Sequence, residues 1–249
     1  MGRVISDCIQ RSDEWHQLRS GKLTASVAHV ITMTGRAKGS ESATRRDLRT
    51  QLALERITGT NCEREFTATD TERGKELEAE ALAAYEARTG VLLSRVGFVY
   101  RDDLPIGCSP DGAVVASHRV FADEAGTVYG PAPDGFDGGV DVKAPRPANH
   151  LAYLREPSKL VADYEAQIAH TLLVTGAPWW DLASYCPQFP AESRLLMVRL
   201  VPMGSAPFDS GAATSAQVID LAAHELNVRL FLKEVDAEAA DIRRLCEAA

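Results

Sequence analysis

The sequence predicts a single domain of mixed α/β (α+β) class, in which helices flank a central mixed β-sheet. The chain of 249 residues is 45% hydrophobic and 25% charged, which suits one globular domain with a full core. Helical and strand-like periods follow one another in the order helix, helix, strands, helix, strands, helix. No internal repeat is visible, so we treat residues 1–249 as one unit.

Caps, glycine stops and apolar periods predict the individual elements. Helices are expected over residues 12–20, from 24 or 26 to 31, through Leu48–Ile57 to the stop at Gly59, and over 70–89 before Gly90. Further helices are expected over 149–155, 158–175 and about 214–247, the last packing on the sheet through Val218, Leu221, Leu226, Leu230 and Phe231. Strands are expected at 91–94, 96–100, 113–115, 140–143, 179–185 and 195–201.

The segment from about 117 to 138 lies between two predicted strands and is rich in Gly, Pro and Asp. This composition predicts a mobile flap or hairpin inserted into the domain. The flap contains Pro133-Asp134-Gly135, but no apolar strand follows this acid, so we exclude it from the candidate site.

Composition and charge restrict the function classes. No apolar run approaches the roughly 20 residues of a membrane span, and the first residues lack an apolar signal region, so we expect a cytoplasmic protein without a membrane partner. The five cysteines are scattered and predict free thiols. The net charge is −8, from 27 basic and 35 acidic residues, which disfavours nonspecific coating of nucleic acid but allows a local basic groove.

The stretch from Gly107 to Lys143 carries the candidate chemistry. Asp111 follows Ser-Pro at a turn and leads into an apolar strand, while Asp141 and Lys143 lie two apart in the next strand. Side chains two apart in a strand share a face. Two carboxylates can hold Mg²⁺, and a lysine beside them can position or deprotonate water. The alternative is an ordinary solvated strand face with a salt bridge.

Several basic residues could contact DNA. Arg19 and Ser26 suit a phosphate at a helix start, or are a surface arginine and a helix N-cap. A basic stretch contains Arg36, Lys38, Arg45, Arg46 and Arg49. This stretch is either a contact to the DNA backbone or a solvated helix face.

Two predicted helices offer further polar residues. The helix over 70–89 carries several glutamates, of which Glu78 lies near the edge of the apolar stripe. The helix over 158–175 carries Gln167 and His170, three residues apart. These two can face the site, or be ordinary polar residues of a half-buried helix.

Five motifs occur in an order that resembles one known family. They are W-H-Q-L-R-S-G-K-L-T-A-S (15–26), R-G-K-E-L-E (73–78), C-S-P-D-G (108–112), D-V-K-A-P (141–145) and Y-E-A-Q (164–167). In this order they are similar to the lambda-type exonucleases, the YqaJ-like viral recombinase group within the PD-(D/E)xK nucleases. The resemblance covers about residues 10–190 and implies a restriction-endonuclease-like core.

The resemblance implies a Mg²⁺-dependent alkaline exonuclease, with Mn²⁺ as an alternative metal. Such an enzyme digests one strand of duplex DNA from a 5′-phosphorylated end and leaves a 3′ single strand for recombination. Members of the family form ring-shaped trimers around DNA and act with a single-strand annealing protein. We therefore expect double-stranded DNA ends, an annealing protein and two further copies of this chain as partners.

The resemblance also implies roles for individual residues. Metal ligands are expected at Asp111 and Asp141, with the Val142 carbonyl as a third and Glu78 as the helix carboxylate near the metals. Lys143 corresponds to the lysine that contacts the attacking water, and Gln167 to the active-site glutamine. The 5′-phosphate pocket corresponds to Arg19, Ser26 and Ser109.

The sequence departs from the lambda pattern at three places. The acid before x-Lys is Asp141 instead of glutamate, and it follows Asp111 by 30 residues, a longer interval than the pattern leads us to expect. A second phosphate-binding arginine is expected shortly after the lysine motif, where Asn149 is the nearest aligned residue and Arg146 is the available substitute. This difference bears on the strength of 5′-phosphate selection.

Overall fold

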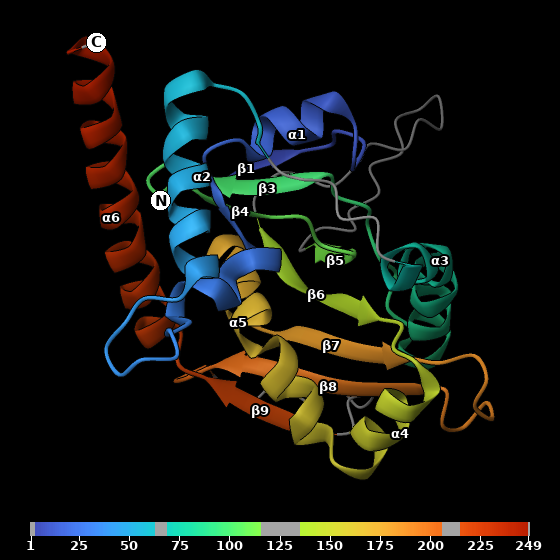
Figure 1. Cartoon of the computed structure of the whole chain (residues 1–249). Helices are drawn as coiled ribbons and strands as arrows, with labels where there is room; N and C mark the ends of the chain where they lie inside the picture. Colours follow the sequence, from blue (N-terminus) through green and yellow to red (C-terminus); the bar gives the residue numbers. More distant parts are fainter. Residues whose placement is uncertain (1–2, 63–68, 116–134, 206–214, 249) are drawn as a thin grey trace, which may run out of the picture.

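The computed structural model describes residues 3–62, 69–115, 135–205 and 215–248, with backbone alone over 69–76 (Figure 1). The fold is mixed α/β, as predicted, but its strands form two mixed sheets. The four-stranded sheet has the order β1 (Arg3–Ser6), β3 (Phe98–Arg101), β4 (Ile106–Cys108) and β2 (Leu23–Thr24). The five-stranded sheet has the order β5 (Gly112–Val115), β6 (Phe136–Lys143), β7 (Trp180–Tyr185), β8 (Leu195–Pro202) and β9 (Ala216–Ile219).

Parallel and antiparallel pairs alternate in the larger sheet. β5 with β6 and β7 with β8 are antiparallel, whereas β6 with β7 and β8 with β9 are parallel. The β6–β7 crossover contains two helices, as a parallel connection requires. β6 therefore lies inside the sheet, and its last residues carry the predicted Asp141 and Lys143.

The helices are α1 (Asp13–Arg19), α2 (Ala43–Thr58), α3 (Thr69–Thr89), α4 (Pro147–Arg155), α5 (Pro157–Thr175) and α6 (Leu221–Glu247), with a 3₁₀ helix η1 (Ala25–Thr32). The predicted N-cap of α1 is present, since Ser12 Oγ accepts from the Trp15 N–H at 3.2 Å. The predicted stops of α2 and α3 are also present, because Gly59 and Gly90 have φ of 67° and 71°. Glycine reaches this left-handed region without the steric cost that a Cβ brings.

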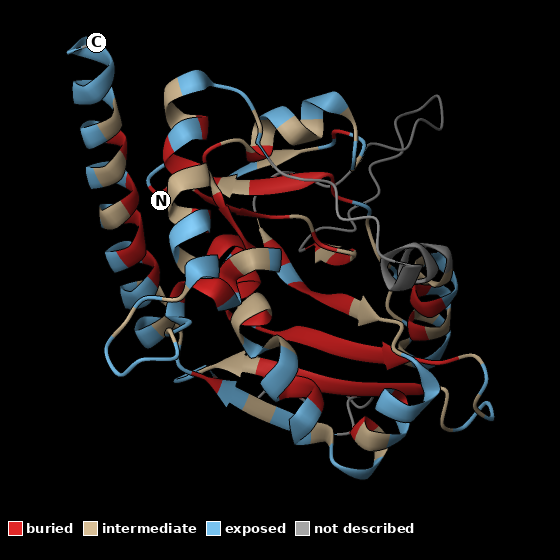
Figure 2. Ribbon diagram, viewed as in Figure 1, coloured by how far each residue is buried: buried red, intermediate tan, exposed pale blue. Residues whose placement is uncertain are grey.

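Helix α5 organises the core. It contacts strands of both sheets as well as η1, α4 and α6, and its second half is fully buried (Figure 2). Ile168 and Leu172 are completely excluded from solvent. The apolar residues of α5, which recur with a helical period in the sequence, thus pack against both sheets.

The structure corrects three of the predicted elements. Residues 91–94 make only a single bridge, between Ser94 and Ala113, instead of a strand. The expected helix over 214–247 begins at Leu221, and Ala216–Ile219 forms the edge strand β9. Of the predicted flap, Phe136–Gly138 belongs to β6, and residues 117–134 lie outside the described part of the chain.

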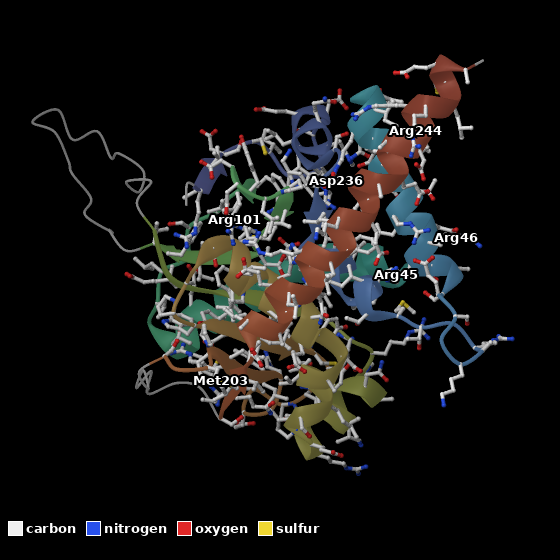
Figure 3. The ribbon with its side chains drawn as sticks, turned by 90° about the vertical axis from the view of Figure 1, so that its left-hand side faces the viewer. Arg45, Arg46, Arg101, Met203, Asp236 and Arg244 are labelled. Atoms are coloured by element: carbon white, nitrogen blue, oxygen red, sulfur yellow. The ribbon has the colours of Figure 1, made fainter. Side chains whose placement is uncertain are left out.

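Helix α6 packs mainly against α2 and not on the sheet, as Figures 1 and 3 show. Phe231 is buried, but Leu226 and Leu230 are 58% and 51% exposed. The apolar period of α6 therefore points partly to solvent. Among the described residues, no helix is both long and apolar enough to cross a membrane.

Candidate active site

The turn Ser109–Pro110–Asp111 joins the two sheets, because it connects β4 to β5. β6 runs past the end of β5 through Asp141–Lys143, so Asp111 lies next to this end of β6. The Val142 N–H donates to Asp111 Oδ2 at 2.9 Å. The N–H and C=O of one strand residue point to the same side, so the Val142 carbonyl faces the side on which Asp111 lies.

Asp141 is a buried carboxylate with an unsatisfied oxygen. The residue is 2% exposed, and its Oδ2 has no hydrogen-bond partner in the described part of the chain. Burial raises the pKa of Asp141, although Lys143 and hydrogen bonds from Asp111 act in the opposite direction. Burial and the charge of Asp141 raise the pKa of Asp111 as well.

This donor set fits a divalent cation. Two buried carboxylates repel each other because water does not screen their charges. A hard cation that binds between them removes this repulsion. The unsatisfied Asp141 Oδ2 and the neighbouring Val142 carbonyl supply further oxygen atoms of the type that Mg²⁺ prefers.

Lys143 lies near the two aspartates, since its charge acts to lower the pKa of both. Its Nζ is 5.0 Å from the centre of the Tyr164 ring on α5. Gln167 lies one turn further along α5 and is half-buried. Residues three apart share a helix face, so α5 presents Tyr164 and Gln167 toward the same side.

Glu78 approaches the site from α3. It acts on the pKa of Asp111 and Asp141, raising both, so its charge lies near them. Its side chain pairs with Arg95 Nη1 at 3.1 Å and Arg11 Nη2 at 3.7 Å. Within the described residues, no three Asp, Glu, His or Cys side chains are grouped closely enough to hold a metal ion. The role of Glu78 as a third carboxylate ligand stays a prediction.

The three residues predicted for the phosphate pocket lie in one chain of contacts. Ser109 Oγ accepts from Trp15 Nε1 at 2.8 Å, and the Arg19 guanidinium lies 4.0 Å from the centre of the Trp15 ring. Arg19 Nη2 donates to Thr24 Oγ1 at 3.4 Å, and Thr24 Oγ1 is 3.3 Å from Ser26 Oγ.

Burial and exposure divide the roles within this pocket. Arg19 is only 7% exposed, whereas Ser26 is exposed and Ser109 is half-buried. The stacked indole of Trp15 orients the Arg19 guanidinium. A guanidinium can stack on a ring because it is planar and its charge is delocalised. The residues predicted for the pocket thus combine a buried guanidinium with one exposed and one half-buried hydroxyl group.

The predicted basic stretch separates into two parts. Arg45, labelled in Figure 3, binds Glu234 on α6 through two hydrogen bonds of 2.8 and 2.9 Å. Arg49 binds Glu238 at 2.5 Å. These two arginines attach α2 to α6, so they are not a solvated face. Arg36 and Lys38 lie on an exposed loop before α2 and stay candidates for DNA contact, together with the exposed Arg46.

Arg146, the proposed substitute for a second phosphate-binding arginine, is exposed at the N-cap of α4. It follows Lys143 by three residues in the chain. Asn149, at the aligned place, is exposed one turn further on.

The sequence model of the YqaJ-like viral recombinase domain matches residues 14–178. The chain belongs to this family. It is a nuclease of the lambda-type exonuclease kind, a hydrolytic enzyme that acts on DNA, and the resemblance inferred from the five motifs is confirmed.

Three solved structures share the fold of this YqaJ-like nuclease. LHK-Exo in complex with dAMP is 25% identical, with a TM-score of 0.68 and coverage of 96% of this chain and 100% of that one. Another structure, the alkaline exonuclease LHK-Exo from Laribacter hongkongensis, is 24% identical, with a TM-score of 0.65 and coverage of 95% of this chain and 99% of that one. A phage-related exonuclease from Haemophilus somnus 129PT is 13% identical, with a TM-score of 0.60 and coverage of 94% of this chain and 99% of that one. Among curated proteins, none matches this sequence.

Two residues of the YqaJ-like site had no role in the sequence prediction. Trp15 lies four residues before Arg19 on one helix, a spacing that brings side chains into contact, so the stacking could have been anticipated. Tyr164 stands in the same motif as Gln167, but its contact with Lys143 crosses from α5 to β6. No local pattern indicates a contact of that kind.

Proposed function

We propose that this nuclease is a Mg²⁺-dependent 5′-to-3′ exonuclease. It digests one strand of linear double-stranded DNA from a 5′-phosphorylated end and leaves a 3′ single strand for phage-type recombination. The family and the exonuclease relatives support the reaction class. The direction, the 5′-phosphorylated end and the metal are what the resemblance to lambda-type exonucleases implies.

The observation that carries the proposal is that Arg19 is linked through the Trp15 ring to Ser109, which stands in the same turn as Asp111. Ser109, which lies in the pocket, precedes Asp111 by two residues, and two residues span at most about 7 Å. That is about the length of one nucleotide. A terminal phosphate bound beside Ser109 would therefore leave the first phosphodiester bond close to Asp111. This geometry favours release of mononucleotides, in keeping with the dAMP bound by LHK-Exo.

The residues then have distinct roles. Asp111, Asp141 and the Val142 carbonyl would hold the metal, which when bound supplies positive charge to the scissile phosphate and to water. Lys143 orients the attacking water or accepts its proton, and Gln167 orients the same region from α5.

Glu78, which we propose as the second-metal or water-binding carboxylate, approaches from α3. The terminal-phosphate pocket of Arg19, Ser26 and Ser109 keeps the enzyme on a DNA end. Arg36, Lys38 and Arg146 supply contacts to the DNA backbone.

The test is digestion of a linear duplex with Mg²⁺, with 5′-phosphate or 5′-hydroxyl ends, beside a closed circle and a Lys143→Ala control. We expect one strand to be lost from phosphorylated ends, an intact circle and an inactive control. Cutting of the circle would indicate an endonuclease on the same core. DNA binding without any cutting would indicate a noncatalytic recombination module.

We also propose that three copies form a ring around the DNA and that the ring acts with a single-strand annealing protein. A ring concentrates few basic residues around one channel, which reconciles a net charge of −8 with a polyanionic substrate. A stable monomer in sedimentation at micromolar concentration, with undiminished processivity, would refute the ring.

A further inference from the structure

Two exposed arginines lie at the edge of the acidic site. Arg95 Nη1 is 3.1 Å from Glu78 Oε1, and Arg11 Nη2 is 3.7 Å from Glu78 Oε2. The side chains of Arg95 and Arg11 are 63% and 50% exposed, while that of Glu78 is 21% exposed. Each guanidinium can therefore reach both the carboxylate and a molecule that arrives from solvent.

The backbone of Arg95 is attached to the strand that follows Asp111. Its neighbour Ser94 exchanges two backbone hydrogen bonds with Ala113, at 2.8 and 3.0 Å. The carbonyl of Val96, on the other side of Arg95, accepts from Gln10 Nε2 at 3.0 Å.

Gln10 attaches Arg11 to the same segment. Its Nε2 also donates to the Pro110 carbonyl at 3.1 Å, directly before Asp111. One amide side chain thus holds three segments together, and both arginines start from backbone that is tied to the Asp111 turn.

Arg11 has an unusual backbone conformation. Its φ is 72°, the only positive φ at a non-glycine residue in the part of the chain that the structure describes. The turn around it is closed by the Ser12 N–H, which donates to the Ile9 carbonyl at 3.1 Å, so Arg11 occupies a position where glycine is favoured. Such strain is retained where the side chain has a function.

We propose that Arg11 and Arg95 bind phosphates of the DNA strand at the active site, and that they pair with Glu78 only until DNA displaces the carboxylate. Half-exposed ion pairs contribute little to stability, so the exchange is easy. Phosphate contacts release counterions and favour binding. The arginines also compensate the repulsion between DNA and three nearby carboxylates, and the exchange frees Glu78 to turn toward Asp111.

This inference deepens the proposed function, because it depends on Glu78 and Asp111 belonging to the nuclease site. Binding is therefore measured separately from digestion. We would measure the affinity for a short 5′-phosphorylated duplex by fluorescence anisotropy over a range of salt concentrations, in a Lys143→Ala background. Arg11→Gly and Arg95→Ala are compared with Arg229→Ala, since Arg229 is 46% exposed and pairs with Glu225 on α6.

We expect Arg11→Gly and Arg95→Ala each to weaken binding roughly tenfold at low salt and to reduce the slope of log affinity against log salt by about 1. Arg229→Ala should change neither quantity. Glycine removes the strain at residue 11, so the melting temperature of Arg11→Gly should be unchanged or higher. A protein that binds DNA less well and is no less stable would show a binding role.

Unchanged slopes in both variants would overturn the inference, as would weaker binding that merely follows a lower melting temperature. Digestion by the unaltered enzyme distinguishes this failure from failure of the proposed function. If the enzyme digests phosphorylated ends but the slopes do not change, the arginine inference alone is wrong. If the slopes change but no DNA is digested, the arginines bind DNA and the exonuclease proposal is wrong.

Discussion

Acidification should destabilise this protein through a buried pair of histidines. His170 on α5 is fully buried, and its Nδ1 is 3.3 Å from His224 Nε2 on α6. The other nitrogen of His170 is 3.1 Å from the Leu23 carbonyl, directly before Thr24 of the phosphate pocket. Burial lowers the pKa of His170 from 6.5 to about 3 and that of His224 to about 4, with His224 adding to the effect on His170.

The sign and size of the effect follow from these values. Below pH 6.5 both histidines bind protons in the unfolded chain but stay neutral in the folded protein. The free energy of unfolding therefore has its full value above pH 6.5 and decreases as the pH falls. At pH 5 the histidines of the folded protein are still neutral. In the unfolded chain, pH 5 is about 1.5 units below the pKa of histidine, and each unit corresponds to about 1.36 kcal/mol. Each histidine then lowers the free energy of unfolding by about 2 kcal/mol, or about 4 kcal/mol for the pair.

Urea denaturation in EDTA at pH 8 and pH 5 measures this loss. His170→Gln retains a donor for the Leu23 carbonyl but cannot titrate, so it should lose about 2 kcal/mol less than the unaltered protein between these pH values. The raised pKa values of Asp111 and Asp141 act with the opposite sign, but they are common to both proteins and cancel in the difference. His29→Gln, at an exposed position, is the control. Equal pH dependence of the unaltered and His170→Gln proteins would refute the reasoning.

Three further changes test other parts of the structure. Tyr164→Phe should retain digestion, because the ring still faces the Lys143 ammonium. Tyr164→Leu removes the ring and should lower kcat roughly tenfold with KM little changed. Equal activity of both variants would contradict a role for the ring. Arg19→Lys should reduce the preference for 5′-phosphate over 5′-hydroxyl ends roughly tenfold, because lysine loses the stacked, forked geometry, and competition between the two ends would measure it. Glu238→Gln should lower the free energy of unfolding by about 1 kcal/mol or less, because its contacts to Arg49 and Thr50 are partly exposed; added salt should reduce the difference, and a salt-independent loss would argue against ion pairing.

Sequence reasoning succeeded where the signal is local. The cap at Ser12 and the stops at Gly59 and Gly90 follow from backbone chemistry within a few residues. The strand that carries Asp141 and Lys143 was predicted from its two-residue period, and both residues lie in β6. The five motifs identified the family, and the family comparison confirmed it.

The predictions that the structure contradicts concern segments whose partners lie far away in the chain. The basic stretch was expected to be a DNA contact or a solvated face, but Arg45 and Arg49 pair with glutamates of α6 that are 189 residues distant. The apolar residues of α6 predicted packing on the sheet, and the helix packs instead on α2. A charge or an apolar stripe indicates that a partner is needed, without indicating which one.

The sequence by itself determined the family of this protein, the class of its fold and the identity of its candidate ligands, because short motifs and periods are written in neighbouring residues. Only the tertiary structure decided that the strands divide into two sheets joined at Asp111. It also decided that Trp15 stacks on a buried Arg19 next to Ser109, and that Arg11 and Arg95 meet Glu78. These contacts join segments that chain folding brings together, and their energies depend on burial and distance, which no local pattern specifies.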